Sequence, residues 1–557
     1  MSCACVTIYD TLVVSGCVTK LVDLSIARLS MVHTMKSLSL IFLLLPCVKT
    51  TAFLTSSPRA VGNRPLPNIS SLHTKRERSN APALQAQVIS GGSVDIRPES
   101  DILKSSLAVG IITAFVGFVY GKILGQSVKT VWTILPNLII RRLGSINPAL
   151  FITGMCTMGG LLVGLLSLKF SSTFTVADFV SSFSAAPAET LPSSGDHLLP
   201  LLLLSLVTST FGFSVGPEAP MVCAGALIGA SLSRYWYGDN NESQETLAYA
   251  GAAGALTAFM GIPIAGSIFA LELTCANAGL SKAGGKALAP SIISSISAIT
   301  LIRGLLLPSK AVGGHFAYGT VGALSGRAMI LVALACGAGG AVIGTSFHRL
   351  VAMMKSVAWR NNTVKGEKSS WKRPLLVKTL IGLVVGIIST NYPQTLFWGE
   401  GSLQMAIDGQ NTAFSATKHG LSDILTSAAR VNPSLPFGNS AAAVQVGIAK
   451  LFSIALACAG KFPGGIIFPL FFAAAPLAHA FGSLIGSDLV PVAVCCLMGA
   501  TQASVTRTPL ATVLMLTLTA SATTELSVIL PACMISSYLG VFLSRQLSEK
   551  SYFGYKE

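Results

Sequence analysis

The sequence predicts an all-α protein that crosses a membrane many times. Apolar residues make up 51% of the 557 positions, and charged residues make up only 11%. A soluble domain carries about 25% charged residues, so this chain lacks the polar side chains that would cover a water-facing surface. From residue 107 onward, apolar segments follow one another with short connections, and they contain glycines and prolines, as membrane helices often do. A polytopic helical bundle is therefore expected, and a soluble fold is excluded.

The formal net charge of +16 is compatible with nucleic acid, an anionic lipid surface or an anionic substrate. No basic patch is interleaved with aromatic residues, so nucleic acid is not an expected partner. The twelve cysteines form no C-x-x-C pair and lie mostly in apolar runs, which favours buried free thiols. The histidines at 315, 348, 419 and 479 are scattered, and no nucleophile stands beside a base. We expect neither an enzyme nor a cofactor or metal site.

Residues 1–95 have the composition of a targeting presequence. Met35-Lys36 precedes a short apolar core, and Thr51-Ala52-Phe53 and a basic, hydroxyl-rich and acid-poor stretch follow it. A signal peptide joined to a transit-like segment resembles the bipartite plastid presequence of algae with secondary plastids. The expected location is a thylakoid or envelope membrane, and the alternative is an endomembrane signal with a disordered tail. Whether translation starts at Met1 or Met35 stays open.

We expect apolar helices at thirteen places along the rest of the chain. They lie near residues 107–124, 147–168, 198–213, 219–233, 246–273, 288–307, 328–350, 374–391, 441–459, 465–486, 490–504, 508–520 and 526–544. Several are shorter than the ~20 residues that a straight span requires. The polar stretch 355–374 is expected to be a solvated loop.

The short helices point to an internal duplication. Glycine and proline interrupt the apolar segments at Gly216-Pro217, Gly261-Ile262-Pro263 and Pro463-Gly464-Gly465. The first and the last of these interruptions lie about two thirds of the way through each half. Broken helices in matching positions of two halves are typical of inverted-repeat transporters whose site lies between the halves. We expect a first repeat over 101–310, a second over 325–548 and a short tail over 549–557.

The segment Ser214-Val-Gly-Pro-Glu-Ala-Pro220 places one carboxylate, Glu218, at a helix start inside an apolar region. Gly216 and Pro217 end the preceding helix, and Pro220 suits the first turn of the next one. A helix N-terminus with free backbone N–H groups is a ready anion site. Glu218 is expected to occupy that site as a built-in anion, and its protonation would release the site to a competing ion. The alternative role is a helix-start carboxylate that only complements the helix dipole.

Lys461-Phe-Pro-Gly-Gly-Ile-Ile-Phe-Pro469 has the same design in the second half, with a glycine pair, a break and a helix start. We expect helix starts at about 218 and 466 to face each other. Two such N-termini on one cavity can bind an anion without a full positive charge, weakly enough for the ion to leave.

These motifs resemble those of the CLC family of chloride channels and proton/chloride antiporters. Gly-Pro-Glu-Ala-Pro is similar to the family's Gly-x-Glu-Gly-Pro motif, and Gly465-Ile-Ile-Phe-Pro469 to its Gly-x-Phe-x-Pro motif. Ile262–Glu272 looks like its Pro-x-Ala-Gly…Phe…Glu helix. Thr506-Arg-Thr-Pro-Leu-Ala-Thr and Ile529-Leu-Pro531 look like its last helices. The resemblance implies an inverted-repeat bundle of broken helices that meet at the midplane, and a homodimer with one pore per subunit. The family's CBS domains are not expected in this chain.

The resemblance also implies the site residues. Glu218 corresponds to the gating glutamate. The implied anion-binding residues are Gly216, Glu218, Ala219, Gly465, Ile466, Ile467 and Phe468. The chain departs from the family pattern at Pro217, at Ala219 and at Ile467, where the family has phenylalanine. The inner hydroxyls have no clear counterpart: Ser171, Ser172 and Thr173 are candidates for the serine, and Thr523, Thr524 and Ser527, around Leu526, for the tyrosine.

Proton-coupled members of the family generally carry a second glutamate at the position of Leu273. Leucine cannot relay a proton, and the neighbouring Glu272 is expected to make structural hydrogen bonds. The leading hypothesis is a voltage-gated-type channel for chloride or another small inorganic anion. The alternatives are a proton-coupled chloride antiporter and, because the serine and tyrosine motifs are missing, a non-conducting membrane scaffold.

Overall fold

The computed structural model describes residues 99–144, 146–170, 174–182, 194–278, 285–306, 316–319, 326–359, 372–409, 440–520, 526–548 and 551–554. The presequence expected over residues 1–95 lies outside the described residues. So do Ser171, Ser172, Thr173, Thr523, Thr524 and most of the tail expected over 549–557. The part of the chain that the structure describes is helical apart from loops and two isolated bridges. The all-α fold class is confirmed.

The first half runs from α3 to the end of a π-helical turn, η3. Its helices are α3 (Glu99–Lys129), continued by η2 (Thr130–Ile134) and α4 (Leu135–Leu143), then α5 (Pro148–Lys169), α6 (Val176–Ser182), α7 (Ser194–Thr210), α8 (Glu218–Tyr237), α9 (Asn241–Met260), α10 (Pro263–Ala278), α12 (Leu288–Ile299) and η3 (Thr300–Leu306).

The second half contains a similar series. Its helices are α13 (Gly326–Ala358), α14 (Lys372–Asn391), the short turns η4 (Pro393–Thr395), η5 (Glu400–Ser402) and α15 (Leu403–Ile407), then α18 (Ser440–Ala459), α19 (Ile467–Ile485), η6 (Ser487–Leu489), α20 (Val490–Thr506), α21 (Pro509–Leu518), α22 (Leu526–Leu547) and η7 (Tyr552–Gly554).

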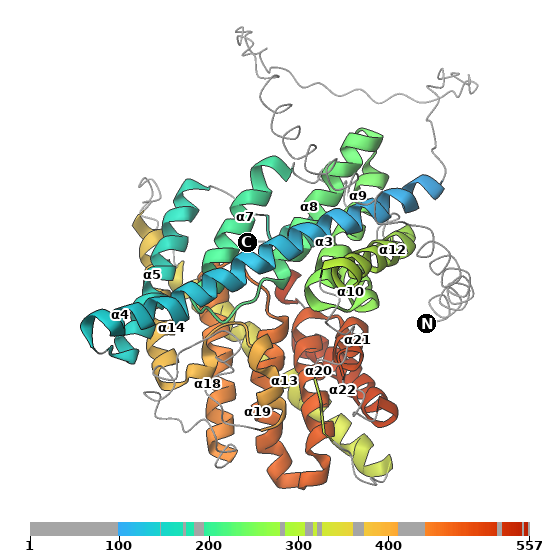
Figure 1. The fold of residues 1–557 in the computed structure, drawn as a ribbon. Coiled ribbons are helices and arrows are strands. Elements are labelled where there is room, and N and C mark those ends of the chain that lie inside the picture. Colours follow the sequence, from blue (N-terminus) through green and yellow to red (C-terminus); the bar gives the residue numbers. More distant parts are fainter. Residues whose placement is uncertain are drawn as a thin grey trace, which may run out of the picture. The chain divides into compact units, whose positions relative to one another are not determined.

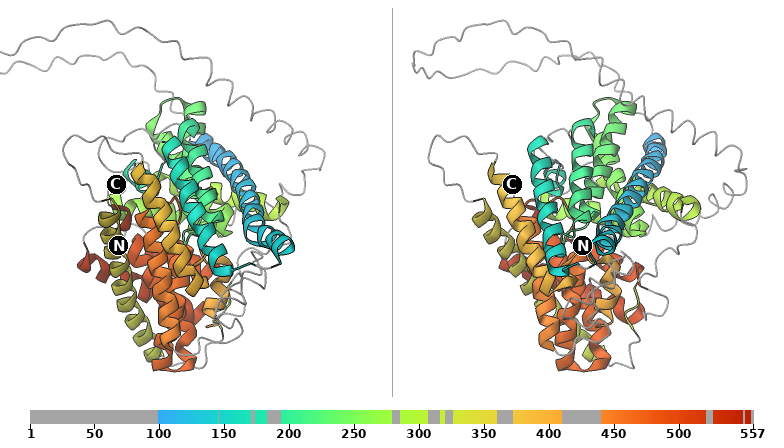
Figure 2. Two further views of the ribbon diagram at one scale, coloured as in Figure 1. Left: turned by 90° about the vertical axis from the view of Figure 1, so that its left-hand side faces the viewer. Right: turned by 60° about the vertical axis from the view of Figure 1, so that its left-hand side comes forward.

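The two halves repeat one packing pattern. In the first half α3, α9 and α12 pack against one another, and α8 packs on α9; in the second half α13, α20 and α22 form the same group, and α19 packs on α20. The halves also touch through corresponding helices, α5 with α14 and α10 with α21, as two related halves would (Figure 1). Figure 2 shows α5 and α14 side by side from two further directions. The inverted-repeat architecture is therefore confirmed.

Several expected helices differ in detail from the observed ones. The single segment expected over 246–273 is two helices, because Gly261 adopts φ +75° at the end of α9 and Pro263 then begins α10. A left-handed glycine with a proline two residues later stops a helix, which is the interruption expected at Gly261-Ile262-Pro263. The stretch 355–374 is not entirely loop either, because α13 extends to Ala358 and α14 begins at Lys372.

Six helical segments of the described chain are long and apolar enough to cross a membrane. They are Asp101–Leu143, Pro148–Lys169, Leu288–Leu306, Gly326–Ala358, Arg373–Asn391 and Ser440–Ala459. Five shorter apolar helices, α7, α10, α19, α20 and α21, accompany them. Short helices that start inside the bundle leave their first N–H groups there, and α19 is one of them.

Candidate functional site

The two broken segments meet in the interior of the protein. The N–H of Gly216 donates to the carbonyl of Gly465 at 2.8 Å, and the N–H of Gly465 donates back to the carbonyl of Gly216 at 2.5 Å. Each partner stands two residues before a helix, because α8 begins at Glu218 and α19 at Ile467. The helix starts expected at about 218 and 466 are thus held together by a reciprocal pair of backbone bonds.

Neither bridging position has room for a Cβ while Glu218 keeps its observed position. A Cβ on Gly216 would overlap the Glu218 carboxylate, and a Cβ on Gly465 would lie 2.6 Å from both Cγ and Cδ of Glu218. Real Cβ atoms do not come this close to other heavy atoms, so the glycines create the space in which the Glu218 side chain folds back over its own helix start.

Glu218 is fully buried between the two helix starts. Its Oε1 accepts a hydrogen bond from the backbone N–H of Phe468 at 3.3 Å, and the amide of Ile467 also faces the carboxylate. Its Oε2 has no hydrogen-bond partner among the described residues. The N-cap residues of α8 and α19, Pro217 and Ile466, provide no side-chain capping bond. The carboxylate therefore lies where the N–H groups of a helix start would hold a free anion.

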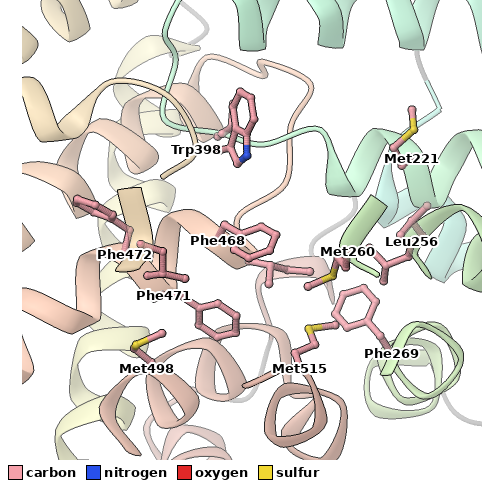
Figure 3. Close-up of a cluster of buried hydrophobic side chains, with 14 of the residues drawn as sticks. Met221, Leu256, Met260, Phe269, Trp398, Phe468, Phe471, Phe472, Met498 and Met515 are labelled. Atoms are coloured by element: carbon pink, nitrogen blue, oxygen red, sulfur yellow. The ribbon is translucent and has the colours of Figure 1, made fainter. Parts of the chain in front are cut away.

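The structure brings all seven anion-site residues named from the sequence together, and five of them reach a cavity. The five cavity-lining residues are Glu218, Ala219, Gly465, Ile466 and Ile467. Gly216 lies behind the Glu218 carboxylate. The side chain of Phe468 instead lies in a buried apolar cluster with Met260 and Met515, where α9, α19 and α21 approach each other (Figure 3). Around the Glu218 carboxylate, backbone amides are the polar groups that would contact an ion.

The cavity next to Glu218 has a volume of about 790 Å³ and a basic lining. Lys355, Lys378 and Lys461 line it, and so does Asp178, which accepts bonds from the backbone and hydroxyl of Thr175. Lys378 is 5% exposed, and its Nζ donates to Ser167 Oγ at 2.8 Å and to the Lys461 carbonyl at 3.2 Å. Positive charge along a narrow cavity raises the local concentration of anions.

The basic lining could not be read from the sequence, because Lys355, Lys378 and Lys461 belong to three separate segments. Thr506 and Tyr552 also line the cavity. The sequence motifs marked neither of them as an ion-site residue, although Thr506 opens the motif that resembles the family's last helices. Ser527, a candidate from the sequence, is exposed at the start of α22 and is not among the residues that line the cavity.

Glu272 and Leu273 occupy different environments on α10. The two carboxylate oxygens of Glu272 accept bonds from the N–H groups of Leu510 at 3.0 Å and Ala511 at 2.8 Å, in the first turn of α21. These are structural bonds of the kind expected for Glu272. Leu273 is fully buried in the main apolar core.

Comparison with known proteins agrees with this architecture. Residues 159–541 match the family model described as "Voltage gated chloride channel". The chain is 26% identical over 373 residues to the "Putative ion-transport protein YfeO" of Shigella flexneri, which covers 66% of this chain and 75% of that protein. Escherichia coli (strain SE11) has a relative with the same name, identity and coverage. The chain belongs to the voltage-gated chloride channel (CLC) family and is an integral membrane protein of the anion-transporting type.

Solved structures show the same fold. A slow cyanobacterial Cl⁻/H⁺ antiporter superposes with a TM-score of 0.64 at 16% identity, covering 82% of this chain and 97% of that one. A CLC-type fluoride/proton antiporter gives a TM-score of 0.59 at 17% identity, covering 80% of this chain and 96% of that one. A eukaryotic CLC transporter gives 0.60 at 15% identity, covering 82% and 73%.

Proposed function

We propose that the chain is a channel that lets chloride, or another small inorganic anion, cross the membrane past Glu218. The observation that supports this most directly is the buried Glu218 carboxylate, held by an N–H group of the opposite helix start. An anion that displaces the carboxylate would find the same N–H groups and the dipoles of two helices. Glu218 would then be the gate, and Gly216, Ala219, Gly465, Ile466, Ile467 and Phe468 would shape the ion site.

The residues at 272 and 273 favour uncoupled movement of the anion. A proton exchanger needs a titratable group that carries protons between Glu218 and the other side. Leu273 is buried and apolar, and Glu272 is engaged with both oxygens by the amides of Leu510 and Ala511. Movement of the Glu272 carboxylate as a proton carrier would break both of these hydrogen bonds.

A proton-coupled antiporter is the second candidate function. It is supported by the two solved structures of the same fold that are described as a Cl⁻/H⁺ antiporter and a fluoride/proton antiporter. Because the second structure is described as a fluoride/proton antiporter, fluoride is also a candidate for the transported anion.

We further propose two repeats over residues 101–310 and 325–548, a homodimer with a separate pore in each subunit, and a plastid membrane as the location. The repeated packing of α3, α9 and α12 by α13, α20 and α22 supports the repeats. The family resemblance supports the dimer, and the composition of residues 1–95 supports the plastid.

The test is anion efflux from liposomes under a chloride gradient, with proton movement recorded at the same time. Chloride efflux without proton movement, changed by Glu218→Ala, would support the channel. Stoichiometric proton movement that Glu218→Ala abolishes would replace the channel by the antiporter. No flux from protein that is folded and correctly inserted would leave the non-conducting scaffold.

A further inference from the structure

The side chain of Lys450 on α18 is fully buried. Its Nζ, with three N–H donors, lies within hydrogen-bond distance of four consecutive carbonyl oxygens, of Gln394 at 3.4 Å, Thr395 at 3.2 Å, Leu396 at 3.5 Å and Phe397 at 2.6 Å. It also lies 5.0 Å from the centre of the Phe472 ring. Among the residues that the structure describes, none of its recorded contacts is with a carboxylate.

The backbone around Lys450 is shaped to hold this charge. The turn η4 leads into Phe397, which adopts φ 59° although it is not glycine. A left-handed phenylalanine is strained. The Phe397 N–H is fixed to the carbonyl of Gly212 at 3.0 Å. The resulting path points successive carbonyls at one nitrogen, so four dipoles and an aromatic face solvate the ammonium.

Carbonyl oxygens solvate a buried cation, but they do not neutralise it. A buried charge without an opposite charge nearby is costly, and removal of one partner from a buried pair is strongly destabilising. A positive charge on Lys450 would therefore be stabilised by a negative charge within reach of its field.

The Lys450 cage is linked to the Glu218 site through neighbouring residues of both. The carbonyl of Thr395 accepts from Lys450 and also from the hydroxyl of Ser214, which stands four residues before Glu218. On the other side, Phe472 lies one helical turn after Phe468, whose N–H binds the Glu218 carboxylate. Figure 3 shows Phe468 and Phe472 on neighbouring turns of α19. The cage therefore contacts the segment that enters α8 and the first turns of α19.

We propose that Lys450 is the fixed positive charge of the anion site. Its counter-charge is the Glu218 carboxylate when the site is closed, and the transported anion when Glu218 has left it. This inference rests on the proposed anion pathway past Glu218. Lys450 does not touch the ion; it is a positioning residue whose field, transmitted through the low-dielectric interior, makes occupation of the site by an anion favourable.

The test is chloride binding to the full-length protein by isothermal titration calorimetry, together with chloride flux. Lys450→Met keeps the length of the side chain and removes the charge, whereas Lys450→Arg keeps the charge. Lys104→Met is the matched control, because Lys104 pairs with Asp101 on the exposed start of α3. We expect Lys450→Met to weaken chloride binding about tenfold or more. Lys450→Arg should stay near the wild type, and Lys104→Met should change nothing.

Chloride binding by folded Lys450→Met equal to the wild type would overturn the proposal. If Lys450→Met does not fold, the double variant Lys450→Met/Glu218→Gln decides. Recovery of folding on loss of both charges would support the pairing of Lys450 with Glu218, and failure with or without Glu218 would overturn it. Absence of flux from wild-type protein that still binds chloride would contradict the proposed function alone.

Discussion

Two glutamates of the described residues, Glu218 and Glu272, bind backbone amides at the start of a helix in the other half, and they are held differently. Both carboxylate oxygens of Glu272 accept hydrogen bonds from amides in the first turn of α21, a helix of the other half. Glu218 also reaches a helix of the other half, but only Oε1 accepts a bond, from the Phe468 N–H, and Oε2 has no partner among the described residues. A carboxylate with hydrogen bonds to both oxygens is a structural cap. A carboxylate with a hydrogen bond to one oxygen, beside a cavity, loses fewer hydrogen bonds when it moves. The two carboxylates therefore differ in how many of their oxygens are hydrogen-bonded, and the less firmly held one, Glu218, is the one proposed as the gate.

Removal of the charge of Glu218 should have the largest effect on transport. In Glu218→Gln the side chain no longer competes as an anion, so chloride flux should rise, about tenfold for an interaction of about 1.4 kcal/mol. Wild-type flux should also rise as the pH falls, because protonation neutralises the same carboxylate. The measurement is liposome flux across a pH series. A variant that keeps the pH dependence of the wild type would show that another group is the gate.

Gly465→Ala tests whether the observed position of the Glu218 side chain depends on the absence of a side chain at residue 465. A Cβ there would lie 2.6 Å from Cγ of Glu218 and 2.9 Å from the amide of Ala219, so the carboxylate must be displaced. Overpacking of this kind costs about 1–3 kcal/mol, and flux should become high and nearly independent of pH. Gly121→Ala is the control, since a Cβ at Gly121 has no neighbour within 4 Å. Normal pH-dependent flux in Gly465→Ala would contradict the observed position of Glu218.

Glu272→Ala should lower stability and leave transport unchanged. Loss of the carboxylate leaves the N–H groups of Leu510 and Ala511 without their acceptor, at a cost of about 1–3 kcal/mol. Glu242→Ala is the control, because Glu242 is an exposed member of an ion pair with Lys286, and such pairs contribute about 0–1 kcal/mol. Thermal unfolding in detergent measures both. A stable Glu272→Ala protein with altered proton movement would make Glu272 a proton carrier and favour the antiporter.

Local helix breaks could be predicted from the sequence, and long-range contacts of polar side chains could not. The starts of α8 and α19 were predictable because Gly-Pro and Pro-Gly-Gly act locally on the backbone. The contacts of Glu272 were not, since Leu510 and Ala511 lie in another half of the molecule. Lys450 stands in an apolar run, and the carbonyls that surround it come from residues 394–397, so no local pattern marks the cage. The partners of Glu272 and Lys450 lie far away in the sequence, so these contacts require the folded structure.

The smallest expected effect is that of the positive charge in the cavity that Glu218 lines and Glu272 does not. Lys355 is half-buried in the cavity beside Glu218 and, like Lys378 and Lys461, contributes positive charge there. Lys355→Met should lower chloride flux about twofold at low ionic strength, and the difference should disappear at about 1 M salt, where the Debye length is about 3 Å. Lys104→Met, a change of the same charge on an exposed surface, should show no such salt dependence. A loss of flux in Lys355→Met that persists at high salt would mean that Lys355 binds the ion directly, and the ion site would then extend from Glu218 into the cavity.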